Sequence, residues 1–259
     1  MGATPVRNPR LLDRQVELLR HLTGVDLIFG EEKWAVLADD PSLRGISIPH
    51  LRLEAEMSHN KRMGKLENAL QRTFACLAER RDRVFREFAA ACPPESYRRY
   101  DEALCFCTFL ENYWKSEPPS PPFILDLARL ELALARISAF RKADRDGSSI
   151  PPQLNDRRPL VRLLPSVEIL KMNYDLRCLF EAGRTGEPSE RAHYILVAQM
   201  KRGVGPRITE ISAPLADVLE RIRQWAALEE VLEDIGPDQP DARESLRKFL
   251  NAGVVEVVQ

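Results

Sequence analysis

The pattern that most constrains the fold lies in the last third of the chain, from residue 193 to residue 259. Two short runs of β-branched and apolar residues come first, at 194–197 and 207–212, and a basic turn with glycines separates them. Two such runs joined by a glycine-containing turn are typical of a β-hairpin. Three helical repeats follow, and the apolar run 254–258 predicts a final strand. The predicted order of strand, strand, helix, helix, helix, strand is that of a winged helix.

The three helical repeats of this segment each place apolar residues on one helix face. The spacing i, i+3, i+4, i+7 occurs twice and a weaker repeat follows: Leu215, Val218, Leu219 and Ile222; Leu228, Val231, Leu232 and Ile235; Ala242, Leu246, Phe249 and Leu250. Such spacing indicates amphipathic helices. Asp241 followed by Glu244 predicts a capping box at the start of the third helix, and Gly253 is expected to end that helix.

A winged helix suggests DNA binding, and the charge of the segment bears on that interpretation. Between residues 226 and 244 the only basic residue is Arg243, whereas the acidic residues are Glu229, Glu230, Glu233, Asp234, Asp238, Asp241 and Glu244. Binding to duplex DNA requires basic side chains that neutralise phosphates. The acidic surface favours a peptide partner, which would add as a strand to the hairpin edge beside the third helix. A DNA-binding transcriptional regulator is the alternative.

A chain of 259 residues is long enough for one large core or two smaller ones. Its formal net charge of -1 selects neither nucleic acid nor an anionic membrane as a partner. No apolar run approaches the ~20 residues of a membrane span, and the first ten residues lack the apolar core of a secretory signal. The five cysteines are an odd number, which is typical of reduced thiols. We therefore expect a cytoplasmic protein.

The whole chain is predicted to be mainly α with a small β part. Helical patterns before the C-terminal segment cover residues 9–21, 50–92, 97–114 and 123–140. The last of these is apolar on most faces, which predicts the central helix of an N-terminal bundle. Strands are expected at 160–164 and 167–170. The expected division is an N-terminal extension (1–56), a helical domain (57–141), a linker rich in Gly, Pro, Ser and Asp (142–158) and a winged-helix-like α+β domain (159–259).

Four short motifs occur in order along the chain. Residues 122–131 read P-F-I-L-D-L-A-R-L-E, and residues 66–74 fit L-x-x-A-L-x-x-T-F. Cys92-Pro93-Pro94 interrupts the helical part, and residues 165–174 fit P-S-V-x-x-L-x-x-x-Y. Together they resemble the P-Y-L-x-D-L-A-R-L-E helix and the other motifs of the partner subunits of multinuclear non-heme iron-dependent oxidases. The resemblance covers roughly the chain after residue 60, and residues 1–56 have no counterpart.

The resemblance implies a function in the biosynthesis of ribosomally made, modified peptides. Such subunits are not enzymes and hold no cofactor; each forms a heterodimer with a TIM-barrel oxidase that carries the iron. Their winged-helix part resembles a RiPP recognition element, which holds the leader of a precursor peptide by strand addition. The oxidase then modifies cysteine in the core peptide, by oxazolone and thioamide formation in methanobactin or by β-carbon excision in the thiaglutamate pathway. The long N-terminal extension favours the thiaglutamate type.

Carried onto this chain, the resemblance implies two sets of binding residues. The leader-binding set comprises Ile208, Thr209, Glu210 and Ile211 of the second hairpin strand, and Arg243, Leu246, Arg247, Phe249 and Leu250 of the last helix. The alternative is that the apolar members of the helix form the core and that its basic members are solvated. The expected oxidase interface comprises Phe29, Trp34, Trp114 and Phe123, although the sequence favours a folded N-terminal cap for the first two.

The sequence offers little for chemistry of its own. The four histidines, His21, His50, His59 and His193, have no second ligand at i+3 or i+4, so a helical metal site is not expected. Cys105 and Cys107 would lie ~200° apart on a helix and cannot chelate one ion together. Neither a nucleophile elbow nor a phosphate-binding loop is present. We therefore expect a binding subunit with neither a catalytic residue nor a metal site, and no nucleic-acid or membrane partner.

Overall fold

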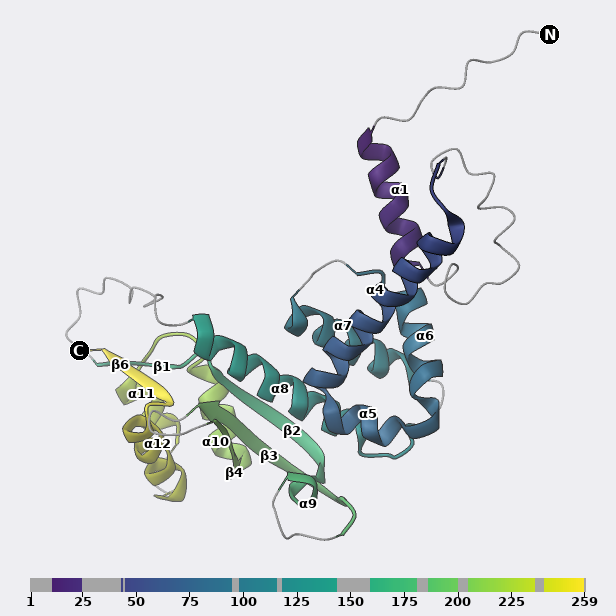
Figure 1. The fold of residues 1–259 in the computed structure, drawn as a ribbon. Helices are drawn as coiled ribbons and strands as arrows, with labels where there is room; N and C mark the ends of the chain where they lie inside the picture. Colours follow the sequence, from purple (N-terminus) through teal and green to yellow (C-terminus); the bar gives the residue numbers. More distant parts are fainter. Residues whose placement is uncertain are drawn as a thin grey trace. The chain divides into compact units, whose positions relative to one another are not determined.

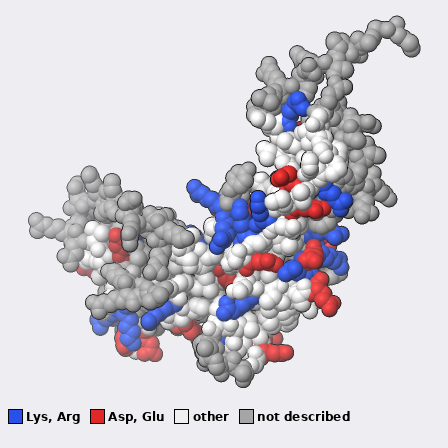
Figure 2. Space-filling view, in the orientation of Figure 1, with Lys and Arg blue, Asp and Glu red and all other residues white. Residues whose placement is uncertain are grey.

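The computed structural model describes residues 11–24, 43, 45–94, 98–115, 118–143, 159–180, 186–199, 205–235 and 240–258. The chain divides into two compact units, Met1–Ser116 and Glu117–Gln259 (Figure 1). The described residues form helices and two small antiparallel sheets, in agreement with a mainly helical chain that has a small β part. Within these ranges no helix combines the length and the apolar character of a membrane span. Basic and acidic side chains both occur on the face that Figure 2 shows.

The described part of the first unit is helical, as predicted. Its elements are α1 (Leu11–Thr23), α4 (Ile48–Ala69), α5 (Gln71–Leu77), η3 (Ala78–Arg80), α6 (Arg81–Ala91) and α7 (Arg99–Tyr113). Helix α6 ends immediately before Cys92 and Pro93, because a proline cannot donate the backbone hydrogen bond that would continue the helix. Leu51 and Ala55 of α4 are buried against Leu18 and Leu22 of α1. The boundary expected at residue 56 therefore falls inside α4.

The core of the first unit is aromatic and encloses one ion pair. Phe88 and Phe106 are fully buried, with ring centroids 5.0 Å apart. Arg62 Nε donates to Glu102 Oε2 at 2.7 Å, and Arg62 Nη2 donates to the Cys92 carbonyl at 2.6 Å. The Arg62 guanidinium also lies 4.5 Å from the centroid of the Phe88 ring. The buried charges are thus compensated by each other, by a carbonyl and by a ring face.

The second unit is organised around an antiparallel sheet. Strands β2 (Val167–Asp175), β3 (Ser189–Gln199) and β4 (Pro206–Ile211) pair in the order β2-β3-β4. The hairpin of β3 and β4 is the one that the sequence predicts. Side chains of a strand point alternately to the two faces of the sheet. Leu196 and Ala198 of β3 therefore face one core, while Ile195 and Val197 face the other side.

Helix α8 (Ile124–Ala143) covers this other side of the sheet, along β2 and β3 (Figure 1). The sequence assigned the segment to a helical domain, 57–141, as the central helix of a bundle, and the structure differs on both points. Apolar residues on most faces indicate burial, but they do not reveal whether the buried surface meets helices or a sheet. The expected linker, 142–158, lies largely outside the described residues.

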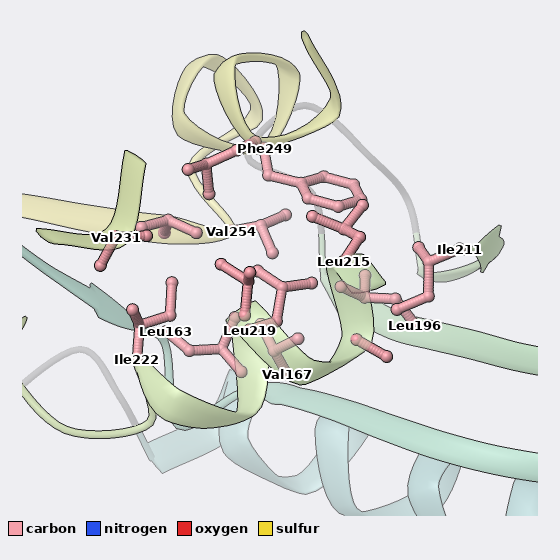
Figure 3. Packing of buried hydrophobic residues seen from close by; sticks show 14 of the residues in the cluster. Leu163, Val167, Leu196, Ile211, Leu215, Leu219, Ile222, Val231, Phe249 and Val254 are labelled. Carbon is pink, nitrogen blue, oxygen red and sulfur yellow. The ribbon is translucent and has the colours of Figure 1, made fainter. Parts of the chain in front are cut away.

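The opposite face of the sheet packs on α10 (Ala213–Arg221), α11 (Leu228–Asp234) and α12 (Pro240–Ala252). Figure 3 shows side chains from these helices meeting those from the sheet, with Phe249 of α12 directed toward Leu215 of α10. The three helices and their apolar faces are those predicted. Asp241 lies in the first turn of α12 instead of at its N-cap, because the helix begins at Pro240.

A second sheet closes the core of this unit. Strand β1 (Leu160–Leu163) lies between β5 (Ala226–Ala227) and β6 (Val255–Val258), and both pairs are antiparallel. The turn from α12 into β6 depends on Gly253, which has φ 68°. Val254 N–H donates to the Phe249 carbonyl at 2.9 Å, which is the bond of a Schellman cap. The last helix and strand are thereby fixed relative to each other.

Candidate functional site

Strand β4 is an outer strand of the β2-β3-β4 sheet. The backbone of β4 pairs with β3 from Tyr194↔Ile211 to Gln199↔Pro206. Among the described strands none pairs with the other side of β4. An edge strand presents unpaired N–H and C=O groups to an extended chain beside it. Strand β4 therefore offers the groups that strand addition requires.

Side chains of β4 are divided between the two faces of the sheet. Ile211 is buried in the core with α10 and α12 (Figure 3), and by alternation Thr209 points to the same side. Ile208 and Glu210 point to the opposite side, where α8 lies. Ile208 is 36% exposed, which is unusual for a β-branched residue at the centre of a strand. The four residues predicted on β4 thus contribute to two different surfaces.

Ile208 and Glu210 line a pocket of about 400 Å³ on the α8 side of the sheet. Its walls are apolar and come from elements far apart in the sequence: Leu130 and Leu134 of α8, Met172 of β2, Ile195 of β3 and Phe180 of α9 (Arg177–Phe180). Its rim is polar and includes Tyr174, Asp175, Arg177, His193 and Glu210. An apolar pocket with a few polar groups at its rim is the usual form of a ligand site.

The charged rim is a network of two arginines and two carboxylates. Arg177 Nε donates to both oxygens of Asp175, at 2.9 and 3.0 Å. Arg191 Nη2 donates to Glu210 Oε2 at 2.7 Å and lies 3.6 Å from Asp175 Oδ2. Arg177 Nη1 lies 3.8 Å from Glu210 Oε2, which closes the ring of charges. The network joins the end of β2 to β3 and β4.

These contacts determine the protonation of both carboxylates. Hydrogen bonds from the Arg177 side chain hold the pKa of Asp175 well below its usual range, against the opposing effect of burial. The hydrogen bond from Arg191 likewise lowers the pKa of Glu210. Both groups are therefore ionised at neutral pH, and the formal charges of the two arginines and two carboxylates cancel. The rim is therefore polar, but its network has no net charge that would favour anions or cations.

Asp126 of α8 fixes the wall of the pocket to the sheet. Its buried carboxylate accepts hydrogen bonds from the Asn173 and Tyr174 backbone N–H groups, at 2.5 and 3.0 Å. These residues lie where the register of β2 shifts between Met172 and Tyr174. The extra residue of this irregularity lies on β3, between Glu190 and His193, and Asp126 binds the N–H groups of β2 beside it. Asp126 therefore orients Tyr174 at the rim.

The predicted leader-binding residues of α12 lie elsewhere. Leu246 and Phe249 are 1% and 7% exposed and belong to the core, and Leu250 packs partly against it. This is the alternative that the amphipathic pattern left open. Arg243 Nη2 donates to the Leu232 carbonyl at 2.9 Å and links α12 to α11, whereas Arg247 is exposed. The structure thus does not bring the α12 set together with Ile208 and Glu210.

The residues predicted for an oxidase interface are dispersed. Phe29 and Trp34 lie outside the described residues. Trp114, at the end of α7, is 8% exposed and contacts the Tyr113 ring with centroids 5.7 Å apart. Phe123, just before α8, contacts the Tyr174 ring with centroids 6.4 Å apart. Trp114 therefore packs within the first unit, and Phe123 packs beside the pocket rim of the second.

A second pocket, in the first unit, is lined partly by charged side chains and by His59. Among the described residues no group of His, Cys, Asp and Glu has the arrangement that holds a metal ion. His59 packs edge-on against Phe85, and its pKa is lowered by burial and by Arg62 and Arg86. Cys107 is buried in α7, while burial and the neighbouring Cys92 raise the pKa of Cys105 to about 11. A thiol with a raised pKa is a poor nucleophile.

The pocket residues missed by the sequence prediction left one usable signal. Residues 171–174 read Lys-Met-Asn-Tyr and alternate polar with apolar side chains, as a strand does, and β2 extends to Asp175. The pocket residues of α8 and α9 could not be predicted, because no local sequence pattern indicates that these helices lie beside β4. Comparison with known proteins adds no family to this picture: no protein-family model matches the chain, and neither does any curated protein.

Proposed function

We propose that this chain is a non-catalytic recognition subunit that holds an extended peptide along strand β4. The observation that carries the proposal is an edge of β4 with which no described strand pairs, beside an apolar pocket on the α8 side. Main-chain hydrogen bonds to an edge strand give affinity for any extended peptide, and pockets beside the strand select its side chains. In this proposal the two sheets with α10, α11 and α12 form a winged-helix-like recognition domain.

The charge of the helices supports a peptide partner over DNA. Two basic side chains of these helices pair with carboxylates: Arg221 of α10 with Asp234 of α11 at 2.7 Å, and Lys248 with Glu244 of α12 at 2.7 Å. Figure 2 shows basic and acidic side chains close together on the visible face of the second unit. Duplex DNA requires a continuous basic surface. A transcriptional regulator is therefore the weaker hypothesis, and a salt-dependent shift with duplex DNA would favour it.

The resemblance of the motifs supplies the proposed partner and substrate. We infer that the chain forms a heterodimer with an iron-dependent oxidase and presents the cysteine-containing core of a ribosomal precursor peptide to it. The iron belongs to the oxidase, and modification by β-carbon excision is favoured over oxazolone and thioamide formation. The motif helix 122–131 supports this proposal only indirectly, since its Asp126 has a structural contact inside this chain.

The proposal is tested by co-expression with a candidate oxidase and a short precursor peptide from the same genome. We expect the chain and the oxidase to co-purify, and the mass of the peptide to change only when both are present. An unmodified peptide, together with the absence of a stable complex, would exclude the oxidase partnership. Peptide binding is measured separately, by fluorescence anisotropy of the labelled precursor with the purified chain alone.

Strand addition is tested by two variants that place a charge on an exposed strand residue. Ile208→Asp puts a carboxylate beside the pocket and should weaken peptide binding at least about tenfold. Val257→Asp is the matched control, because Val257 is 43% exposed on β6 of the other sheet. Equal affinities of the two folded variants would place the peptide away from β4. Backbone N-methylation of the peptide should reduce affinity at every second position, because alternate N–H groups face β4.

A further inference from the structure

The pocket on the α8 side of the sheet has the position and the lining of a selectivity pocket. It lies on the face opposite α12, and three residues of β4, Pro206, Ile208 and Glu210, form part of its lining. A strand that pairs with the outer edge of β4 alternates its own side chains between the same two faces. Every second residue of such a strand therefore points toward the α8 side, next to Ile208 or next to Glu210.

The chemistry of the two neighbouring positions differs. Ile208 is itself apolar, and its partner in the register of β3 is the fully buried Val197. The part near Glu210 lies against the ionised network of Asp175, Arg177 and Arg191, whose charges cancel. A large apolar side chain gains by leaving water at the first position, whereas at the second it would remove hydration from charged groups. A polar residue suits the second position.

We propose that the pocket binds one large apolar side chain of the guest peptide, Leu, Ile, Met or Phe, with a polar residue two positions away. The inference rests on the proposed peptide-binding function and adds the determinant of sequence selectivity. The pocket volume of about 400 Å³ is large enough for any of these side chains. The anchor selects the register, because a shift by one residue turns it to the other face.

The matched variants for the test come from α8. Leu134 lines the pocket, whereas Leu132, two residues earlier, does not, and both are partly buried. Residues two apart on a helix point ~200° away from each other, so the same substitution acts on opposite sides of α8. Leu134→Trp fills part of the pocket, and Leu132→Trp controls for the effect of a larger residue on the fold. Circular dichroism and thermal unfolding confirm that both variants are folded.

The probe is a displayed library of random 12-residue linear peptides, selected on the full-length chain. Wild type and Leu132→Trp should enrich peptides with a large apolar residue and a polar residue two positions apart. Leu134→Trp should reduce the affinity of those peptides about tenfold, which corresponds to about 1.4 kcal/mol. The selected peptides could bind equally to wild type and Leu134→Trp but more weakly to Ile208→Asp. That result would contradict binding of the anchor in the pocket and would still support strand addition. A library that yields no binder would overturn both.

A cross-link locates the anchor directly. Photo-leucine replaces the enriched apolar residue of one selected peptide, and mass spectrometry maps the site of insertion after irradiation. Insertion into residues 124–143 or into α9 is the expected result. Insertion into α12, between Pro240 and Ala252, would show that the anchor lies on the opposite face and would overturn the inference.

Discussion

At the residue scale, the carboxylates that matter most for the second unit are engaged in structural contacts. Asp126 accepts two backbone hydrogen bonds from β2, where its register with β3 shifts, and Asp175 lies between Arg177 and Arg191. Sequence alone singled out the motif that contains Asp126, but it could not supply the reason, because the partners lie 47 and 48 residues away. The same limit applies to Leu246 and Phe249, since an apolar helix face looks identical whether it lines a core or a groove.

The contact of Asp126 predicts the effect of removing its acceptor. Asp126→Ala leaves the Asn173 and Tyr174 N–H groups without their acceptor, and it should lower the free energy of unfolding by about 2–3 kcal/mol. Asp126→Asn retains an acceptor oxygen and should cost less. Urea unfolding monitored by fluorescence measures both variants. Equal stabilities of wild type and Asp126→Ala would contradict this assignment.

The network around Asp175 predicts a pH dependence of stability. The pKa of Asp175 is depressed in the folded state, so its contribution is complete above the pKa of the unfolded chain, about 3.9, and is lost as the pH falls further. Asp175→Asn should therefore lower the free energy of unfolding at pH 7 by about 1 kcal/mol, a value that allows for the partial exposure of both arginines. At pH 3 the difference from wild type should be smaller.

Asp234→Asn provides the control for that pH dependence. Asp234 and Arg221 form a pair whose side chains are 50% and 62% exposed, and exposed pairs contribute little to stability. The control should unfold like wild type at both pH values. A difference between Asp175→Asn and wild type that grows toward pH 3 would contradict the expected sign.

At the element scale, the structure follows the sequence where the signal is local. Helices α10 and α11 have strong apolar periodicity and α12 a weaker one, and the hairpin of β3 and β4 has a turn signal between its strands. The pairing of β1 with β6 could not be predicted, because it joins residues 160–163 to residues 255–258 and depends on the whole core. The position of α8 was missed for a related reason: its apolar faces reveal burial but not the partner.

Substitution of two glycines, one at the end of a helix and one inside a helix, should change stability in opposite directions. Gly253 has φ 68° at the end of α12, a conformation that a residue with a Cβ adopts at a cost, so Gly253→Ala should destabilise by about 1 kcal/mol. Gly64 lies inside α4, where an added Cβ would meet nothing within 4 Å. Gly64→Ala should therefore stabilise by about 0.5–1 kcal/mol. The measurement is thermal unfolding of both variants. A shift of the two unfolding temperatures in the same direction would contradict this interpretation of Gly253.

At the scale of the whole molecule, the two units place the boundary differently from the sequence. The second unit begins at Glu117 and includes α8, whereas the sequence predicted a C-terminal domain from residue 159. Met172, Ile195 and Val197 are at most 5% exposed, and they lie outside the core formed with α10 and α12. Their side of the sheet is the side that α8 covers. A fragment without α8 would expose these residues to water.

The boundary is tested with two fragments, 117–259 and 159–259. Burial of each large apolar side chain stabilises a fold by about 1.5–3 kcal/mol, and whole domains are stable by only about 5–15 kcal/mol. The longer fragment should therefore unfold in one cooperative transition, whereas the shorter should aggregate or unfold without one. Peptide affinity distinguishes the roles of α8 further, because the longer fragment retains every wall of the pocket and should bind selected peptides like the full chain. If the shorter fragment bound them equally well, α8 would be dispensable for both folding and selectivity, and β4 alone would hold the peptide.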